Sequence, residues 1–159
     1  MPMKKDIYVL LHNIRSTHNV GSIFRTSDAL GVTKLILSGY TPTPVDRFGK
    51  LRRDIAKVAL GAEKTIPWEH TDNPVRFIKG LKKKGVSVVG LEQSEKSIDY
   101  KKVKVKNPTL FIIGNEVEGI DTGILNLCDV IAEIPMKGNK ESLNVSVAYG
   151  IGLARILGL

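Results

Sequence analysis

The 159-residue sequence predicts an α/β domain built on a mostly parallel sheet with helices on both faces. Short apolar runs rich in Val, Ile and Leu alternate along the chain with segments whose apolar residues recur at helical spacing. The runs are nearly continuous, as strands are when both faces of a parallel sheet are covered. The composition, 42% hydrophobic and 25% charged, is typical of a globular protein. No repeat or linker divides the chain, so a single domain over residues 1–159 is expected.

The first half of the chain begins with a predicted strand over 7–11 and a polar loop over 12–19. A helix is predicted over 20–30, because Val20, Ile23 and Phe24 are spaced for one helix face and Gly31 is a favoured stop. The following elements are a strand over 34–37, a loop over 39–44, a basic helix over 51–60, a strand-like piece over 62–68 and a helix over 74–84.

The second half supplies three further predicted strands, over 86–91, 110–113 and 130–134, and a closing helix from about 143 to 157. Gly114-Asn115-Glu116 and a Gly/Lys/Ser loop follow two of these strands, and the polar end Glu92-Gln93-Ser94 faces the same rim. Ligand pockets in such sheets form outside the carboxyl ends of strands. We therefore expect the two loops, with Asn19 and Arg25, to build one site.

The charge distribution suggests two kinds of ligand. The net charge of +8 favours a polyanionic partner. Between Asn107 and Met136 there is no Lys or Arg but there are five acidic residues, which favours a small cationic ligand near the centre. The alternative for each basic cluster is a solvated helix face. The clusters are Arg47, Lys50, Arg52, Arg53 and Lys57; Lys79 and Lys82 to Lys84; and Lys101, Lys102, Lys104 and Lys106.

Several common classes of protein are disfavoured. The sequence lacks a G-x-G-x-x-G fingerprint, a phosphate-binding P-loop and a G-x-S-x-G nucleophile elbow. His12, His18 and His70 show no metal-ligand spacing with Cys128, so no metal is predicted. Cys128 is the only cysteine and is expected to pack in the core. No apolar run is long enough for a membrane span or a signal peptide, so a cytoplasmic location is expected.

The remaining polar candidates lie at loop and helix starts, and each has an ordinary structural alternative. Arg25 shares a helix face with Gly21, which leaves open backbone beside it, and the alternative for Arg25 is a structural salt bridge. Ser142 could be the N-cap of the last helix, and Asn144 a local partner of the backbone. The six candidates are Asn19, Arg25, Asn115, Glu116, Ser142 and Asn144.

Three segments together resemble the motifs of the SpoU, or TrmH, family of RNA ribose 2′-O-methyltransferases in the SPOUT superfamily. They are HNVGSIFRTSDALGV (His18–Val32), LFIIGNEVEGI (Leu110–Ile120) and IPMKGNKESLNVSVAYGIG (Ile134–Gly152), in the family's order and spacing. The resemblance covers essentially the whole chain. It implies a C-terminal trefoil knot that binds S-adenosylmethionine, a tRNA or rRNA substrate, and a homodimer with the active site at or near the subunit interface.

The resemblance also implies roles for individual residues. Arg25 would help to activate the ribose 2′-hydroxyl, Asn19 would orient Arg25 or the hydroxyl, and Glu116 and Asn115 would line the reaction centre. Ser142 and Asn144 would position arginine or ribose. Because arginine is normally locked in its charged form, we favour Arg25 as a stabiliser of the developing alkoxide or a phosphate clamp over Arg25 as a base. The cofactor would be held by Leu91, Gly114, Asn115, Ile134, Met136 and Leu143.

Many members of this family carry an additional RNA-binding domain, whereas here the first predicted strand begins within ten residues of the start. RNA capture is therefore expected to depend on the domain's own basic surface, pooled over two subunits. The candidate phosphate contacts are Arg47, Lys50, Arg52, Arg53, Lys101, Lys102 and Lys104. A non-catalytic RNA-binding protein on the same scaffold is the alternative function, and the presence of all five catalytic candidates argues against it.

Overall fold

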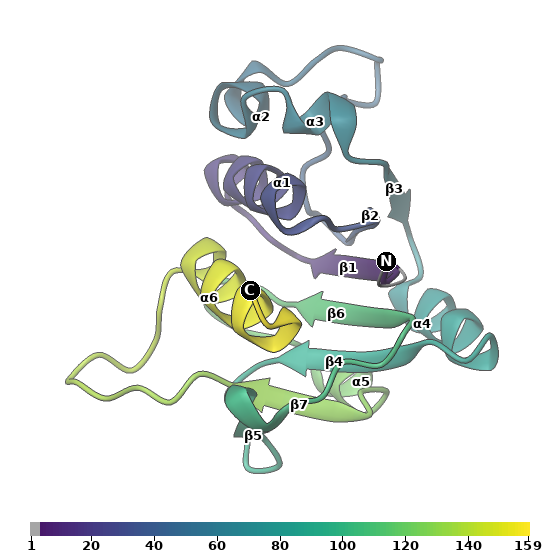
Figure 1. The fold of residues 1–159 in the computed structure, drawn as a ribbon. Coiled ribbons are helices and arrows are strands. Elements are labelled where there is room, and N and C mark those ends of the chain that lie inside the picture. Colours follow the sequence, from purple (N-terminus) through teal and green to yellow (C-terminus); the bar gives the residue numbers. More distant parts are fainter. Residues whose placement is uncertain (1–3) are drawn as a thin grey trace.

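The computed structural model describes residues 4–159, and these residues form one seven-stranded sheet in which every neighbouring pair of strands is parallel (Figure 1). The strand order is β3-β2-β1-β6-β4-β7-β5. The predicted parallel sheet is confirmed. The strands are β1 Ile7–His12, β2 Lys34–Ser38, β3 Trp68–Thr71, β4 Ser87–Leu91, β5 Ile98–Asp99, β6 Thr109–Ile113 and β7 Val130–Glu133.

Helices cover both faces of the sheet, as predicted. One core lies between the sheet and α1 and α6 and extends to α2 and α3, and the other lies between the sheet and α4 and α5. In Figure 1, α1 and α6 lie directly against the strands, and α2 and α3 lie outside α1. The helices are α1 Thr17–Leu30, α2 Arg53–Ala59, α3 Ala62–Thr65, α4 Pro74–Lys83, α5 Thr122–Leu125 and α6 Val145–Leu157, with a 3-10 turn η1 at Tyr100–Lys102.

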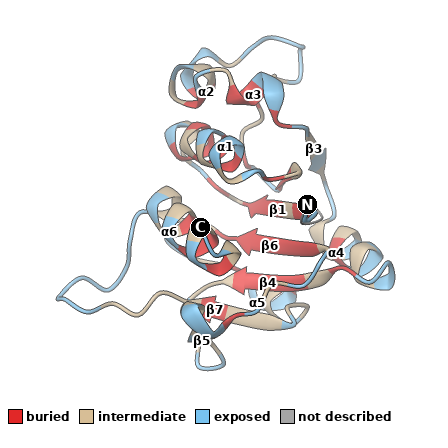
Figure 2. Cartoon of the chain, in the orientation of Figure 1, coloured by how far each residue is buried: buried red, intermediate tan, exposed pale blue. Residues whose placement is uncertain are grey.

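The continuous apolar runs fit this arrangement because successive strand residues point to opposite faces. In β1, Val9 and Leu11 lie in the first core and Leu10 lies in the second, and all three are fully buried. The central strands are buried along most of their length, while the outer faces of the helices are exposed (Figure 2). A strand with one solvated face would instead alternate apolar and polar residues.

The prediction of a strand-like piece over 62–68 is wrong for its first half. Residues 62–65 form the short helix α3, and the strand β3 begins only after Pro67. Ala62, Glu63 and Lys64 are good helix formers, and the Glu63 carboxylate accepts the N–H of Gly61 at 2.9 Å. The buried Ile66 gave the segment its apolar appearance without forming a strand.

Helix boundaries shift from their predicted positions because of capping. Helix α1 begins at Thr17 rather than at residue 20, since Ser16 caps it by accepting the N–H of Asn19 at 3.2 Å. The two-residue edge strand β5 was not predicted. The trefoil knot depends on how the chain threads past itself, which strand order alone does not decide, so the knot stays a prediction. Within residues 4–159, no helix combines the length and apolar character needed to cross a membrane.

Candidate active site at the carboxyl ends of β4, β6 and β7

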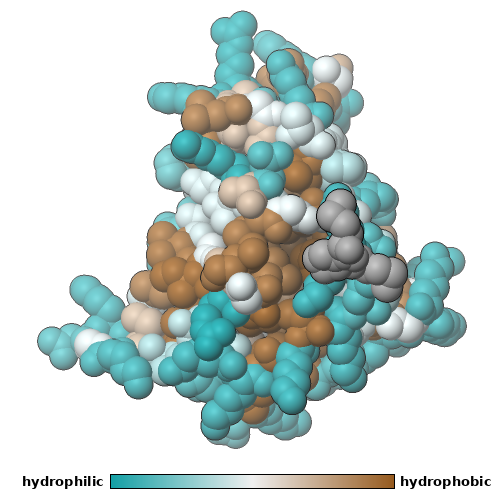
Figure 3. Space-filling view, viewed as in Figure 1, coloured by the Kyte–Doolittle hydropathy of each residue, from teal (hydrophilic) through white to brown (hydrophobic). Residues whose placement is uncertain are grey.

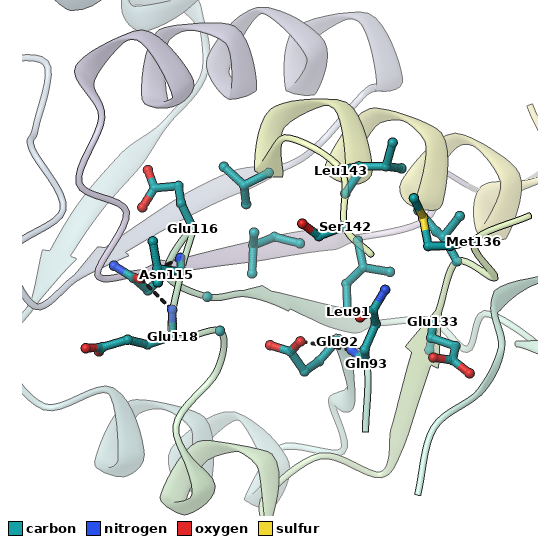
Figure 4. Close-up of a pocket in the computed structure, with 18 residues that line it drawn as sticks. Leu91, Glu92, Gln93, Asn115, Glu116, Glu118, Glu133, Met136, Ser142 and Leu143 are labelled. Atoms are coloured by element: carbon teal, nitrogen blue, oxygen red, sulfur yellow. Dashed lines mark hydrogen bonds between the residues drawn. The ribbon is translucent and has the colours of Figure 1, made fainter. Parts of the chain in front are cut away.

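A cavity of about 240 Å³ lies outside the carboxyl ends of β4, β6 and β7, next to the start of α6 (Figure 4). The loop after β6 and the loop after β7 both line it, so the two loops do share one pocket. All six residues expected to hold a cofactor lie around this cavity, together with Glu116 and Ser142. Those six are Leu91, Gly114, Asn115, Ile134, Met136 and Leu143.

The cavity combines apolar walls with carboxylates. Leu91, Ile134 and Met136 supply apolar surface, and none of the described residues that line the cavity is Lys or Arg. Four carboxylates lie around it, which makes the cavity suited to a ligand with both an apolar body and a positive charge. The carboxylates belong to Glu92, Glu116, Glu118 and Glu133.

Four of the lining residues with polar or charged side chains, Glu92, Gln93, Glu118 and Glu133, were not among the sequence candidates. Glu92 follows β4, and its carboxylate accepts the N–H of Ile120 at 2.8 Å, which ties β4 to the loop after β6. The strand-end position of Glu92 and Gln93 was visible in the sequence. What the sequence did not reveal is that β4 lies directly between β6 and β7.

The loop after β6 closes into a tight turn. The Asn115 and Gly119 backbones exchange two hydrogen bonds, at 3.1 and 3.0 Å. A Cβ atom at Gly114 would lie only 2.4 Å from the carbonyl carbon of Gly119, so position 114 accepts no side chain without moving backbone. The turn therefore presents a fixed wall to the cavity.

The Asn115 side chain organises this loop with every hydrogen-bonding group it has. Its Oδ1 accepts the N–H groups of Val117 and Glu118, both at 2.8 Å. Its Nδ2 donates to the Asn13 carbonyl at 2.9 Å and to the Tyr40 hydroxyl at 2.8 Å. With two donors and two acceptor positions occupied, the amide has no capacity left for a ligand. Asn115 can contact a cofactor only through its backbone or the faces of its side chain.

Glu116 connects the same loop to the first turn of α1. Its carboxylate accepts the backbone N–H groups of Arg15 and Ser16, both at 3.1 Å, and the Asn19 side-chain amide at 3.2 Å. Partial burial acts to raise the pKa of the Glu116 carboxyl, but these hydrogen bonds outweigh it and hold the pKa below its ordinary value. Glu116 is thus ionised and holds the side chain of Asn19, which is buried and does not itself line the cavity.

Arg25 is exposed on α1 and does not line the cavity of its own chain. Within residues 4–159 its guanidinium has no ion pair and no hydrogen bond, so the alternative of a structural salt bridge has no support among these residues. The expectation of open backbone at Gly21 is also wrong. A Cβ there would lie 2.8 Å from the Ile55 carbonyl oxygen, because α2 packs directly on that glycine. Among the described residues, Arg25 is therefore an unpaired cation on a helix that packs closely against α2.

Ser142 and Asn144 have different roles at the start of α6. Asn144, not Ser142, is the N-cap, and its Oδ1 accepts from the Ser146 backbone N–H at 2.9 Å and from the Ser146 hydroxyl at 2.7 Å. Asn144 does not line the cavity, whereas the exposed Ser142 does. Of the two, Ser142 is placed to meet a ligand and Asn144 holds the helix end.

The two clusters proposed to contact RNA lie at opposite ends of the molecule. The cluster of Arg47, Lys50, Arg52 and Arg53 precedes and enters α2, and the cluster of Lys101, Lys102 and Lys104 surrounds η1, beside the edge strand β5 (Figure 1). Lys101 pairs with Asp99 at 3.7 Å, so part of its charge is balanced locally. The two clusters do not form one continuous surface within a single subunit.

Neither metal binding nor thiol chemistry has a visible basis in residues 4–159. No group of three or more His, Cys, Asp or Glu residues there is arranged to hold a metal ion. Burial raises the pKa of the Cys128 thiol to about 11, so the thiol stays protonated near neutral pH and is a poor nucleophile.

Comparison with known proteins agrees with this geometry. Residues 6–154 match the SpoU rRNA Methylase family. The chain belongs to that family. It is 35% identical over 148 residues to the tRNA (guanosine(18)-2′-O)-methyltransferase of Aquifex aeolicus, a match that covers 93% of this chain and 67% of the relative. It is 33% identical to the 23S rRNA (guanosine-2′-O-)-methyltransferase RlmB of Neisseria meningitidis, covering 93% of this chain and 56% of the relative.

Solved structures of the SpoU family share the fold. The AdoMet-bound rRNA methyltransferase from Sinorhizobium meliloti superimposes with a TM-score of 0.86 at 29% identity, covering 98% of this chain and 57% of the other. The chain thus spans little more than half the length of the two rRNA methyltransferases. Because the superposition covers 98% of this chain, it includes the sheet, the cavity and both loops of the candidate site.

Proposed function

We propose that this member of the SpoU family is an S-adenosylmethionine-dependent RNA ribose 2′-O-methyltransferase acting on tRNA or rRNA. The observation that carries the proposal is the cavity formed by the two motif loops, with its apolar walls, four carboxylates and lack of Lys or Arg. The activities named for the Aquifex and Neisseria relatives support the same assignment.

The cavity residues fit the proposed cofactor. Leu91, Ile134, Met136 and Leu143 offer apolar contact to an adenosyl group, and the surrounding carboxylates favour a sulfonium cation. When bound, S-adenosylmethionine supplies an electrophilic methyl group. The fixed turn at Gly114 would hold the cofactor in one orientation, which is the main requirement of an in-line transfer.

The polar residues would handle the RNA. Arg25 is a permanent cation that forms no ion pair within residues 4–159, so it is suited to clamp an RNA phosphate or to stabilise negative charge that develops on the ribose 2′-oxygen. Asn19 is held in place by Glu116 and can orient the hydroxyl or the arginine. The lowered pKa of Glu116 makes that carboxylate a weak base, so we assign it to positioning and not to proton removal.

We further propose that the protein acts as a homodimer through α6. Val147 and Ile151 are four residues apart on one face of α6, and both are more than 40% exposed. Figure 3 shows apolar side chains gathered over this helix. Helix α1 packs against α6, and a Cβ built on Gly150 would lie 3.5 Å from the Thr26 methyl group. In the proposed dimer, the neighbouring Arg25 would serve the cavity of the partner subunit. That arrangement would explain why Arg25 does not line the cavity of its own chain.

Two measurements test the proposed function. Calorimetry with S-adenosylmethionine should detect one binding site per chain, and radiolabelled methyl should transfer from the cofactor to unmodified tRNA or rRNA. The alternative, a non-catalytic RNA-binding protein, predicts RNA binding without transfer. Failure to bind the cofactor, together with no transfer to any RNA, would rule out the enzyme. Mapping ribose methylation in RNA from cells with and without the gene would then identify the nucleotide.

A further inference from the structure

A small closed hairpin spans residues 45–51, between β2 and α2. Val45 and Leu51 pair as an antiparallel bridge, and the Asp46 N–H donates to the Lys50 carbonyl at 2.9 Å. The Asp46 carboxylate accepts the N–H groups of Phe48 at 2.8 Å and Lys50 at 2.9 Å. Gly49 takes a positive φ of 79° at the turn, a conformation that costs glycine little. The tip of this hairpin therefore has a defined shape.

The side chain at the tip is an aromatic ring facing solvent. Phe48 is 79% exposed, although a phenylalanine gains more by burial than most side chains do. The Arg47 guanidinium lies 4.8 Å from the ring centroid and covers part of the ring. A ring held on a closed turn loses little conformational freedom on binding, so it is a favourable platform for a flat ligand.

The surroundings of the ring are strongly cationic. Between residues 46 and 57 there are five basic residues and two acidic ones, and both acidic side chains accept backbone N–H groups within the segment. The hydrogen bond from the Lys50 N–H is the largest of the effects that hold the pKa of Asp46 below its ordinary value, so the turn keeps its carboxylate acceptor near neutral pH. The basic residues are Arg47, Lys50, Arg52, Arg53 and Lys57.

An aromatic ring among cations distinguishes between forms of nucleic acid. Lys and Arg contact phosphates in duplex and single strand alike. A ring adds binding energy only where a base is unstacked, since bases inside a duplex have no free face. The side chains of the hairpin are therefore suited to bind single-stranded nucleic acid.

The hairpin is also connected to the candidate active site. The Tyr40 hydroxyl accepts a hydrogen bond from Asn115, which lines the cavity. Phe48 is only eight residues beyond Tyr40, so the two Cα atoms are separated by at most about 28 Å. One bound RNA segment can reach both places.

We propose that Phe48, with Arg47 beside it, stacks on an unpaired base of the RNA substrate close to the nucleotide presented to the cavity. The hairpin 45–51 thereby selects loops and other single-stranded regions over duplex. This inference rests on the proposed RNA substrate, but it concerns binding and does not require methyl transfer.

Fluorescence anisotropy with a single-stranded RNA of about 12 nucleotides, and with a duplex of the same length, tests the proposal. Phe48→Ala should weaken binding to the single strand about tenfold, the effect of losing one base–aromatic stack, and should leave duplex binding unchanged. Phe48→Leu, which keeps an apolar side chain without a π-face, should behave like Phe48→Ala. Phe48→Trp should retain affinity, and its added fluorescence should be quenched when the single strand binds.

Salt dependence separates stacking from charge. Phe48→Ala should leave the slope of log affinity against log salt unchanged, whereas Lys50→Ala should make it shallower by about 0.7, the value for one phosphate contact on a single strand. Because Phe48 is exposed, its substitution should not alter the thermal midpoint, which serves as the check on folding.

Equal binding of the single strand by the wild type and Phe48→Ala would overturn the proposal, as would equal losses on single strand and duplex. A change of oligomeric state in Phe48→Ala without a change in RNA affinity would instead make the hairpin a protein contact and also overturn it. Selective binding of the single strand by a wild type that transfers no methyl group would refute the proposed enzyme and leave this inference standing.

Discussion

The Glu116 carboxylate lies between the cavity and the first turn of α1, where two backbone N–H groups and the Asn19 amide donate to it. A single residue thus joins a wall of the candidate site to the helix that carries Asn19 and Arg25. For this link the negative charge of Glu116 matters more than its basicity, because an ionised carboxylate accepts hydrogen bonds from several donors and has no proton to donate.

Replacing Glu116 by Gln places an amide group against at least one N–H donor. We expect Glu116→Gln to lower the free energy of unfolding by about 1–2 kcal/mol, a modest value because the carboxylate is partly solvated. Methyl transfer should fall at least about tenfold, since the loop and Asn19 lose their common anchor. Chemical denaturation and a transfer assay measure the two effects. Unchanged stability with lost transfer would mean that Glu116 acts on the reacting groups directly.

The difference in the free energy of unfolding between the wild type and Glu116→Gln should depend on pH in a definite direction. The pKa of Glu116 is lowered in the folded state, so its contribution is fully present above the ordinary value of 4.5 and is lost as the pH falls through the lower folded pKa. The stability difference between the wild type and Glu116→Gln should therefore be largest near pH 7 and shrink below about pH 4.5. A difference that grows on acidification would contradict the assignment.

Arg25 permits a separate test, because it is exposed and its guanidinium forms no ion pair with the residues that the structure describes. Arg25→Ala should abolish methyl transfer, keep S-adenosylmethionine affinity within about twofold, and change the free energy of unfolding by no more than about 0.5 kcal/mol. Calorimetry, a transfer assay and denaturation give these values. Parallel loss of cofactor binding would make Arg25 part of the scaffold.

The sequence predicted which polar residues lie near the site. It did not predict which of them line the cavity and which hold the backbone in place. Polar residues that follow neighbouring strands of a parallel sheet lie at the same edge of the sheet, and the prediction that the two loops share one site rests on this rule. A single Asn at such a place can contact a ligand or bind the backbone, and both choices look alike in sequence. Asn115 and Asn144 both bind the backbone, while Glu92, which was not a candidate, lines the cavity.

At the scale of elements, the close approach of α1 and α2 depends on Gly21. Gly21→Ala would place a Cβ atom 2.8 Å from both the Ile55 carbonyl oxygen and the Val58 Cβ. We expect a cost of about 1–3 kcal/mol from overpacking, which exceeds the gain of at most about 1 kcal/mol from helix propensity. Thermal or chemical denaturation measures it.

Gly80 offers the matched control for that substitution. It lies inside α4, and nothing lies within 4 Å of a Cβ built on it. Gly80→Ala should raise the free energy of unfolding by about 0.5–1 kcal/mol through helix propensity alone. If Gly21→Ala stabilises the protein equally, α1 and α2 do not pack as closely as described.

The long elements were predicted from periodicity because their apolar patterns extend over several turns or a whole strand. The errors lie in short pieces, where few residues decide the outcome. The four residues of α3 were assigned to a strand-like piece that ends near Pro67, and β5 is too short to give any pattern. The caps at Ser16 and Asn144, which set where α1 and α6 begin, depend on side-chain geometry that spacing does not specify.

At the scale of the whole molecule, the exposed apolar face of α6 is the basis of the proposed homodimer. Ile151→Glu should raise the dimer dissociation constant at least about tenfold, because association would bury an unpaired carboxylate. Ile98→Glu is the matched control, since Ile98 is similarly exposed on the edge strand β5, at 41% against 43%. Analytical ultracentrifugation distinguishes the variants. A wild type that stays monomeric at high concentration would refute the dimer.

The proposed dimer also bears on RNA capture, because the two basic clusters lie at opposite ends of one subunit. Two subunits would bring clusters from different chains around one substrate, with Arg25 between the RNA and the cavity. Strand order, which brings β4 between β6 and β7, and the relation of two chains are long-range features that no local pattern encodes. The family resemblance supplied the expectation of a dimer.

The most direct test of the account is the chemical position of the transferred methyl group. RNA labelled by the protein with radioactive S-adenosylmethionine should be digested to nucleosides and separated by chromatography. The label should elute as a 2′-O-methylated nucleoside, and the neighbouring phosphodiester should resist alkaline cleavage, because the attacking 2′-hydroxyl is blocked. Label on a base, or no label in unmodified tRNA and rRNA at saturating cofactor, would contradict it.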